Sequence, residues 1–172
     1  MKVILASGSP RRKKLLEQIN LNFEVQVSNA SEDYKQDQEP SNIVQELALR
    51  KAEQIAGHGQ NATQDLLVIG ADTLVVFDNE ILEKPATEEE ACVMLEKLAN
   101  SHHEVLTGVA LIKKYVDGNK TNVLTFVEKT MVIFGDIEKS EIHEYVQSGS
   151  PMDKAGGYGI QDDWGSVFVK KL

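Results

Sequence analysis

The stretch from Leu66 to Phe77 reads LLVIGADTLVVF and carries the strongest structural signal in the chain. It opens with a short apolar run, which is typical of a buried strand. The run is broken at Asp72 and resumes at Leu74. The pattern therefore predicts a strand that ends at a carboxylate.

A carboxylate at this place has two interpretations. A buried aspartate is unfavourable unless it is paired, hydrogen-bonded or bound to a metal. At a strand end, Asp72 is well placed to hold Mg²⁺ or to activate a water molecule. The alternative is an aspartate in a turn that bonds to nearby backbone. The apolar surroundings favour the functional interpretation.

On both sides of this stretch, strand patterns and helix patterns alternate. Apolar alternation or apolar runs predict strands, and apolar residues at helical spacing after a capping residue predict helices. Alternation with a hairpin in the middle, turning through 117–119, predicts an α/β architecture: a mixed sheet covered by helices. Ligand sites in such sheets lie at the carboxyl ends of strands, near helix starts. We expect strands at 2–6, 23–27, 66–72, 74–77, 105–115, 123–134 and 166–169, and helices at 10–19, 41–57, 88–98 and 137–147.

The composition limits the class of protein. The chain has 172 residues, of which 41% are hydrophobic, and this predicts one domain, with two small lobes around a cleft as the main variant. No apolar run approaches the roughly 20 residues of a membrane helix, and the first is too short for a signal peptide. One cysteine, Cys92, excludes an internal disulfide framework and fits a reducing, cytoplasmic compartment. A net charge of −9 argues against a nucleic-acid polymer or an anionic membrane as partner.

Positive charge is nevertheless concentrated next to the first turn, where residues 6–12 read ASGSPRR. Free N–H groups at a helix start attract anions, and arginine offers paired donors that match phosphate oxygens. The segment lacks the spacing of a P-loop or a dinucleotide-binding turn. It is therefore either a polyphosphate-binding turn or an ordinary capped helix with a basic exposed face.

Other candidate residues are weaker when taken singly. Lys51 and Lys84 alone are interpreted as surface lysines. Glu32, in an acidic loop with Asp33, either supplies a second metal carboxylate or is simply solvated. The segment 151–161 reads PMDKAGGYGIQ, whose glycines permit close approach of backbone to a ligand, and Gln161 offers a donor–acceptor pair to a base edge.

The remaining reactive residue types are predicted to be structural. The four histidines do not form a recognisable metal set, and the adjacent His102 and His103 would point to opposite faces of a strand. Cys92 lies within the apolar stripe of a helix and is interpreted as a small packed side chain.

Four motifs in register are more specific than any one of them. ASGSPRR at 6–12, GADT at 70–73, EKP at 83–85 and DKAGGYGIQ at 153–161 occur in the order and approximate spacing of Maf proteins. The chain thus resembles, over nearly its whole length, the bacterial septum-formation inhibitors with nucleotide pyrophosphatase activity. The resemblance implies a two-lobed α/β fold with a central cleft, similar to inosine triphosphatases, and a homodimer.

The resemblance also implies roles for individual residues. Asp72 matches the general base, and Arg11, Thr73 and Gln161 match the trio that marks the dTTP/UTP subtype. A sister subtype, which prefers 7-methyl-GTP, has tryptophan at the first arginine's position and no threonine after the aspartate. Glu32 matches the loop carboxylate, which would share a metal, Mg²⁺ or Mn²⁺, with Asp72. The remaining phosphate-side matches are Ser7, Arg12, Lys51, Lys84 and Lys154.

We therefore expect metal-assisted attack of water on the α-phosphate of dTTP or UTP, and possible action on CTP or modified pyrimidine nucleotides. This implies a house-cleaning role and a link to septum formation. The alternatives are a nucleotidyltransferase, which needs a second substrate, and a non-catalytic nucleotide-binding regulator of cell division. Two departures from the family are Asp162-Asp163, where glycine usually follows Gln161, and an end at Leu172, before the family's usual C-terminal segment.

Overall fold

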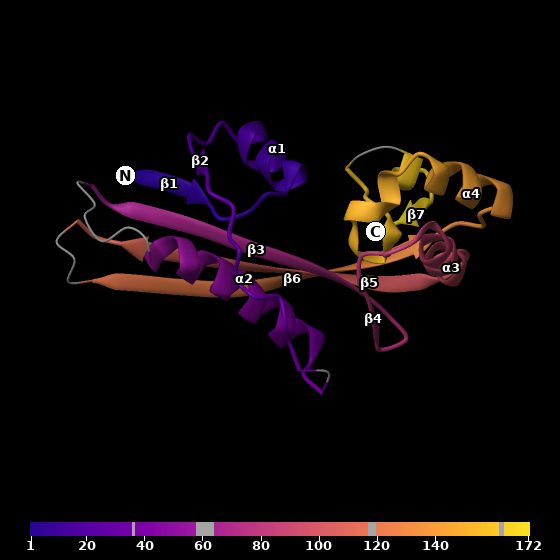
Figure 1. The fold of residues 1–172 in the computed structure, drawn as a ribbon, viewed down its shortest axis with the longest axis horizontal. Coiled ribbons are helices and arrows are strands. Elements are labelled where there is room, and N and C mark those ends of the chain that lie inside the picture. The colour runs from indigo at the N-terminus through magenta and orange to yellow at the C-terminus, as the bar shows by residue number, and fades with distance from the viewer. Residues whose placement is uncertain (36, 58–63, 117–119, 162–163) are drawn as a thin grey trace. The chain divides into compact units, whose positions relative to one another are not determined.

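The computed structural model describes residues 1–35, 37–57, 64–116, 120–161 and 164–172 (Figure 1). The expected hairpin turn at 117–119 and the departure at Asp162-Asp163 lie outside these residues. The chain divides into two compact units: unit 1 comprises Met1–Asp72 and Thr107–Glu128, and unit 2 comprises Thr73–Leu106 and Lys129–Leu172. None of the helices within the described ranges has the length and apolar character needed to cross a membrane.

The predicted α/β architecture is confirmed. Strands in the described residues form a mixed sheet with the order β2-β1-β3-β5-β6-β7, and β4 pairs with β3 off this path. Pairing is parallel between β1 and both its neighbours, and antiparallel between β3 and β4 and between β6 and β7. The strands are β1 (Lys2–Leu5), β2 (Glu24–Val25), β3 (Leu66–Phe77), β4 (Glu80–Leu82), β5 (His102–Lys114), β6 (Thr121–Phe134) and β7 (Val169–Lys171), and the helices are α1 (Pro10–Gln18), α2 (Pro40–Gly57), α3 (Glu88–Leu98) and α4 (Lys139–Gln147).

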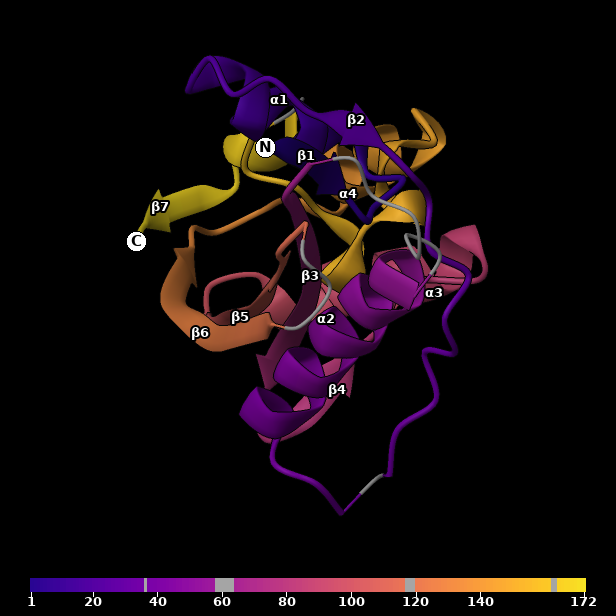
Figure 2. The same cartoon turned by 90° about the vertical axis from the view of Figure 1, so that its left-hand side faces the viewer.

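In unit 1, helix α2 lies directly on the sheet, alongside β3 (Figure 2). A Cβ atom built on Gly70 would lie 2.3 Å from the carbonyl oxygen of Ala48, and one built on Gly108 would lie 2.3 Å from that of Val44. Both distances are too short for any side chain. Glycine at these two positions therefore lets the α2 backbone approach β3 and β5 closely, and the small residues Ala48 and Ala52 fill the contact.

The strand that begins at Leu66 is longer than predicted. Strand β3 runs without a break through Asp72, which is its seventh of 12 residues. The prediction that the strand ends at Asp72 is therefore wrong. The physical reason is charge compensation, because the carboxylate is paired with Lys51 and does not have to leave the sheet to reach water.

Local signals placed most other elements well but misjudged some ends, and the last strand, expected at 166–169, lies instead at Val169–Lys171. Strand β2 is confined to Glu24–Val25, shorter than expected. Helix α2 begins at Pro40, and the Asn42 and Ile43 N–H groups donate to the Glu39 carbonyl, so Ser41 is not its cap. Helix α3 does begin after Thr87, whose hydroxyl accepts from the Glu90 N–H at 3.2 Å.

Unit 2 has an aromatic core. His103 and Tyr158 each pack edge-on against Phe134, with ring centroids 4.9 and 4.7 Å apart, and Phe168 lies between Phe134 and Tyr145. His102 is exposed whereas His103 is buried, as the alternation of a strand predicts. Cys92 packs against this core, as predicted, and burial raises the pKa of its thiol.

Burial of His103 makes the stability of the protein depend on acid. Burial, helped by the neighbouring His102, lowers the pKa of His103 to about 4, whereas an unfolded histidine titrates near 6.5. The unfolded chain therefore binds this proton more readily than the folded protein. The free energy of unfolding is at its full value above pH 6.5 and decreases as the pH falls toward 4. Between pH 7 and pH 5, we expect the free energy of unfolding to fall by roughly 2 kcal/mol more in the wild-type protein than in the His103→Gln variant.

Urea denaturation of the two proteins at both pH values measures this difference. A His103→Gln variant that loses as much stability as the wild type would show that His103 is not the group responsible.

Candidate functional site

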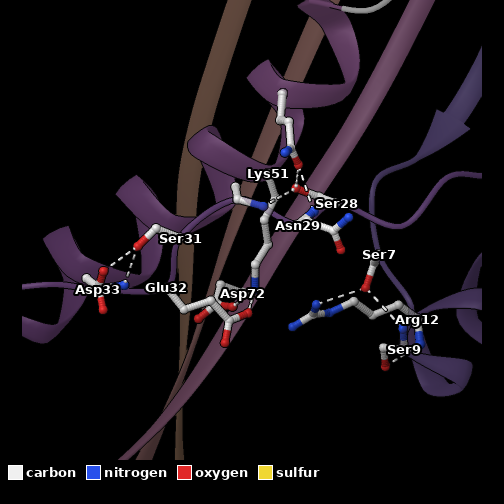
Figure 3. Close-up of polar contacts among 12 residues, drawn as sticks. Ser7, Ser9, Arg12, Ser28, Asn29, Ser31, Glu32, Asp33, Lys51 and Asp72 are labelled. Atoms are coloured by element: carbon white, nitrogen blue, oxygen red, sulfur yellow. Dashed lines mark hydrogen bonds and ion pairs between the residues drawn. The ribbon is translucent and has the colours of Figure 1, made fainter.

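A buried lysine joins two carboxylates in unit 1. Lys51 lies on the apolar stripe of α2, at helical spacing from Ala48 and Ile55, and is only 9% exposed. Its Nζ contacts Asp72 Oδ1 on β3 and lies 2.6 Å from Glu32 Oε1 (Figure 3). The interpretation of Lys51 as a surface lysine is therefore wrong. We call these three residues the charged cluster.

Asp72 is the deepest carboxylate of the cluster. The residue is 8% exposed, and its pairing with Lys51 supplies the compensation that a buried charge requires. Removing either partner of such a pair leaves an uncompensated charge. The close contact of α2 with Gly70, two residues before Asp72, is what brings the lysine within reach.

Glu32 reaches the cluster from an exposed loop that α2 holds at two points. Gln54 Oε1 accepts hydrogen bonds from Ser28 Oγ at 2.6 Å and from the Asn29 N–H at 2.7 Å. Arg50 Nη1 donates to the Asp33 carbonyl at 2.6 Å. Arg50 and Gln54 were not predicted from the sequence. The signal that could have found them is their spacing: Arg50 and Gln54 are four positions apart on α2, which places both near one face of the helix, and Lys51 lies between them in the sequence.

The other loop carboxylate is oriented differently. Asp33 Oδ2 accepts from Ser31 Oγ at 2.7 Å, and Ser31 Oγ accepts from the Asp33 N–H at 3.1 Å. Both residues are exposed. Of the two acidic candidates in this loop, Glu32 is the one that faces Lys51.

The first turn forms a capped helix whose second arginine folds back. Ser9 has extended backbone and its hydroxyl accepts from the Arg12 N–H at 3.5 Å, which confirms the predicted cap. Ser7 Oγ accepts from Arg12 Nη1 at 3.1 Å and from the Ser9 N–H at 3.2 Å. Ser7 is buried, so its hydroxyl holds the Arg12 guanidinium against the interior side of the turn.

Arg12 is electrostatically linked to the charged cluster. Its side chain extends from α1 toward Asp72 (Figure 3). Burial lowers the pKa of the Arg12 guanidinium, and the charge of Arg11 adds to this effect, whereas Asp72 and Glu32 oppose it. Arginine remains protonated in proteins. A positive charge is therefore held beside the two carboxylates, at the N-terminal end of α1.

The two carboxylates of the charged cluster fit a divalent cation. Glu32 and Asp72 both contact Lys51 Nζ, so their oxygens face one positively charged point. Mg²⁺ is usually held by one or two carboxylates together with substrate phosphates and water. Considering only what the structure describes, no group of three or more His, Cys, Asp or Glu side chains is arranged to hold a metal by itself.

The other predicted site residues belong to unit 2. Lys154 is 6% exposed, and its Nζ donates to the Ser150 carbonyl at 2.6 Å and to Asp153 Oδ1 at 2.8 Å. Lys84 and Gln161 are exposed, and Thr73, which follows Asp72 on β3, is half-buried. The structure thus brings together Ser7, Arg12, Glu32, Lys51 and Asp72 in unit 1, with Arg11 beside Arg12, and places Lys154 and Gln161 on one loop of unit 2.

Fold and site define a mixed α/β protein with a buried lysine–carboxylate cluster next to the start of an arginine-bearing helix. The family model of Maf-like proteins matches residues 2–172. The chain therefore belongs to the Maf-like protein family.

Several curated relatives that resemble the chain are named dTTP/UTP pyrophosphatase. A dTTP/UTP pyrophosphatase of Geobacillus sp. (strain WCH70) is 46% identical over 170 residues, which are 99% of this chain and 86% of the relative. A dTTP/UTP pyrophosphatase of Bacillus cereus (strain G9842) is 46% identical over 171 residues, 99% of this chain and 84% of the relative. One of Halalkalibacterium halodurans is 48% identical over 170 residues, with 99% and 84% covered.

Proposed function

We propose that this chain is a nucleoside triphosphate pyrophosphatase that converts dTTP and UTP to the monophosphate and pyrophosphate. The relatives that bear this name share 46–48% identity over 99% of the chain. The observation in the structure that supports the proposal most directly is the buried Lys51–Asp72 pair with Glu32 and Arg12 beside it, because clusters of buried charged groups are concentrated at active sites.

Each residue of the cluster has a role in the proposed reaction. Asp72 orients a water molecule and accepts its proton as the water attacks the α-phosphorus, and pyrophosphate leaves. Lys51 holds the Asp72 carboxylate in place. Glu32 and Asp72 are the residues that would hold Mg²⁺ or Mn²⁺. When bound, such a cation supplies Lewis-acid stabilisation of negative charge on the phosphate oxygens.

Cationic and hydroxyl side chains bind the triphosphate in this proposal. Arg12, anchored by Ser7, presents its guanidinium at the helix start. Positioned positive charges lower the barrier by stabilising the charge that moves onto the leaving group. Arg11, Lys84 and Lys154 are assigned to the same task, and Arg11, Thr73 and Gln161 mark the pyrimidine preference. The enzyme is proposed to act in the cytoplasm, as a homodimer, with a house-cleaning role and a link to septum formation.

A pyrophosphate-release assay tests the proposal and separates its rivals. The purified protein is given dTTP, UTP, CTP, GTP and modified pyrimidine triphosphates with Mg²⁺ or Mn²⁺, and no second substrate. Release of pyrophosphate from dTTP and UTP, abolished by chelation, is the expected result. A nucleotidyltransferase would release no pyrophosphate until a sugar phosphate is added. A non-catalytic regulator would bind the nucleotide and release nothing.

Gln161→Ala is expected to reduce selectivity more than rate. A side chain that hydrogen-bonds a base edge rejects the wrong base because its own polar groups would go unpaired. Gln161 is exposed, so its loss leaves no buried group unsatisfied in the free protein. We expect the ratio of kcat/KM for UTP to that for GTP to fall about tenfold or more, while kcat for UTP changes less. Equal losses on every nucleotide would contradict this role.

A further inference from the structure

A buried hydrogen bond links strand β5 to the glycine-rich loop of unit 2. His103 Nε2 lies 2.6 Å from Tyr158 Oη, and the two residues are 1% and 8% exposed. They are separated by 55 positions in the chain. Across the described ranges, His103 Nδ1 has no hydrogen-bond partner, so the histidine directs its one polar contact to Tyr158.

The surroundings keep this bond in one form near neutral pH. Phe134 packs edge-on against both rings, and the His103 and Tyr158 rings are themselves at 85°. Burial lowers the pKa of His103 to about 4 and raises the pKa of Tyr158. Both groups are therefore neutral at pH 7, and the bond is unaffected by small changes of pH around that value.

Tyr158 stands in the middle of the loop that carries two proposed substrate contacts. Before it, Gly156 and Gly157 have φ of +67° and +74°, and a Cβ on Gly156 would lie 2.9 Å from Val75 Cγ1. After it, a Cβ on Gly159 would lie 3.0 Å from Lys154 Cε, so the lysine stem rests on the backbone next to Tyr158. Gln161 follows two residues later. The loop backbone is thus packed tightly on both sides of the tyrosine.

We propose that His103 is a positioning residue that, by its hydrogen bond to Tyr158, sets the placement of Lys154 and Gln161 for the nucleotide. The inference rests on the proposed function, because it concerns the loop that would bind the triphosphate and read the base. His103 itself is not assigned to contact the triphosphate or the base. The ring of His103 packs in the core like that of any buried histidine. In addition, its hydrogen bond reaches Tyr158 in the glycine-rich loop.

The test removes the hydrogen bond from each end. His103→Phe and Tyr158→Phe keep ring-shaped side chains in the core, His103→Gln retains an amide that can bond the tyrosine, and His102→Phe changes the exposed neighbour as a matched control. Steady-state kinetics on UTP and GTP give KM, kcat and the selectivity ratio. Amide hydrogen exchange of residues 154–161 reports the loop without any need for turnover.

We expect His103→Phe and Tyr158→Phe each to raise KM for UTP about fivefold or more and to lower the UTP-to-GTP selectivity, with faster exchange across 154–161. The double variant should be no worse than either single variant, because both remove one interaction. His103→Gln should recover most of the loss, and His102→Phe should match the wild type. Unchanged KM, selectivity and exchange in both single variants, or additive losses in the double variant, would overturn the proposal.

The two proposals fail in different ways. A wild-type protein that releases no pyrophosphate from any nucleotide refutes the proposed function. Hydrogen exchange in His103→Phe then still decides whether His103 holds the loop, since exchange that stays at the wild-type rate refutes the positioning role by itself.

Discussion

Asp72→Asn is expected to lower turnover of dTTP and UTP by roughly 10²–10⁴-fold, the usual contribution of a general base. Asparagine has nearly the shape of aspartate but cannot accept the proton of the attacking water. The fold should persist, because Lys51 keeps its ion pair with Glu32 at 2.6 Å after the substitution. Much of the nucleotide binding should also persist, because Arg12 keeps its anchor on Ser7 and Glu32 keeps its carboxylate.

The measurement compares kcat for pyrophosphate release with nucleotide affinity and with the urea midpoint. Asp33→Asn is the matched control. Asp33 is an exposed carboxylate next to Glu32, and the Asp33 side chain accepts a hydrogen bond from Ser31. It should behave as the wild type. Full turnover in Asp72→Asn would show that another group is the base, and loss of folding in this variant would make Asp72 structural.

Gly70→Ala is expected to destabilise the protein by roughly 3 kcal/mol or more. The added Cβ would lie 2.3 Å from the Ala48 carbonyl oxygen and 2.9 Å from the Ala52 nitrogen. These neighbours are backbone atoms of α2, which cannot rotate aside, so the helix must move away from β3. Lys51 moves with the helix, and activity should fall together with stability.

Gly57→Ala serves as the control for this change. Gly57 is the last residue of α2, and a Cβ there meets nothing within 4 Å. Alanine also favours helix over glycine by up to about 1 kcal/mol, so this variant should equal or exceed the wild type in stability. Urea denaturation of the two variants provides the comparison. Equal midpoints would mean that the contact between α2 and β3 can relax, contrary to the close packing described above.

The order and type of the elements could be predicted because their signals are local. Apolar spacing and capping residues such as Ser9 and Thr87 act within one or two turns of their own position. The continuity of β3 could not be predicted in this way. The group that keeps Asp72 inside the strand is Lys51, 21 positions away in the chain, and a local pattern shows only an unfavourable charge.

The residues of the candidate site also differ in whether a local sequence pattern could have revealed them. The stripe of α2 could have revealed Lys51, because a lysine at helical spacing from Ala48 and Ile55 lies on the buried face. The placement of Glu32 could not be found from its own exposed loop, since it depends on bonds made by Arg50 and Gln54. Alternation along β5 correctly separated His102 from His103, but only the tertiary structure pairs His103 with Tyr158.

The direct seating of α2 on two glycines has a consequence for how the chain can vary in length. One residue added inside the helix between Val44 and Lys51 would rotate everything beyond it by about 100°. The ammonium would then leave the sheet-facing side, and a different side chain would meet Asp72. Any change of length inside α2 between Val44 and Lys51 would therefore separate Lys51 from Asp72, so the contact of the helix with the sheet fixes the seven-residue spacing between Val44 and Lys51.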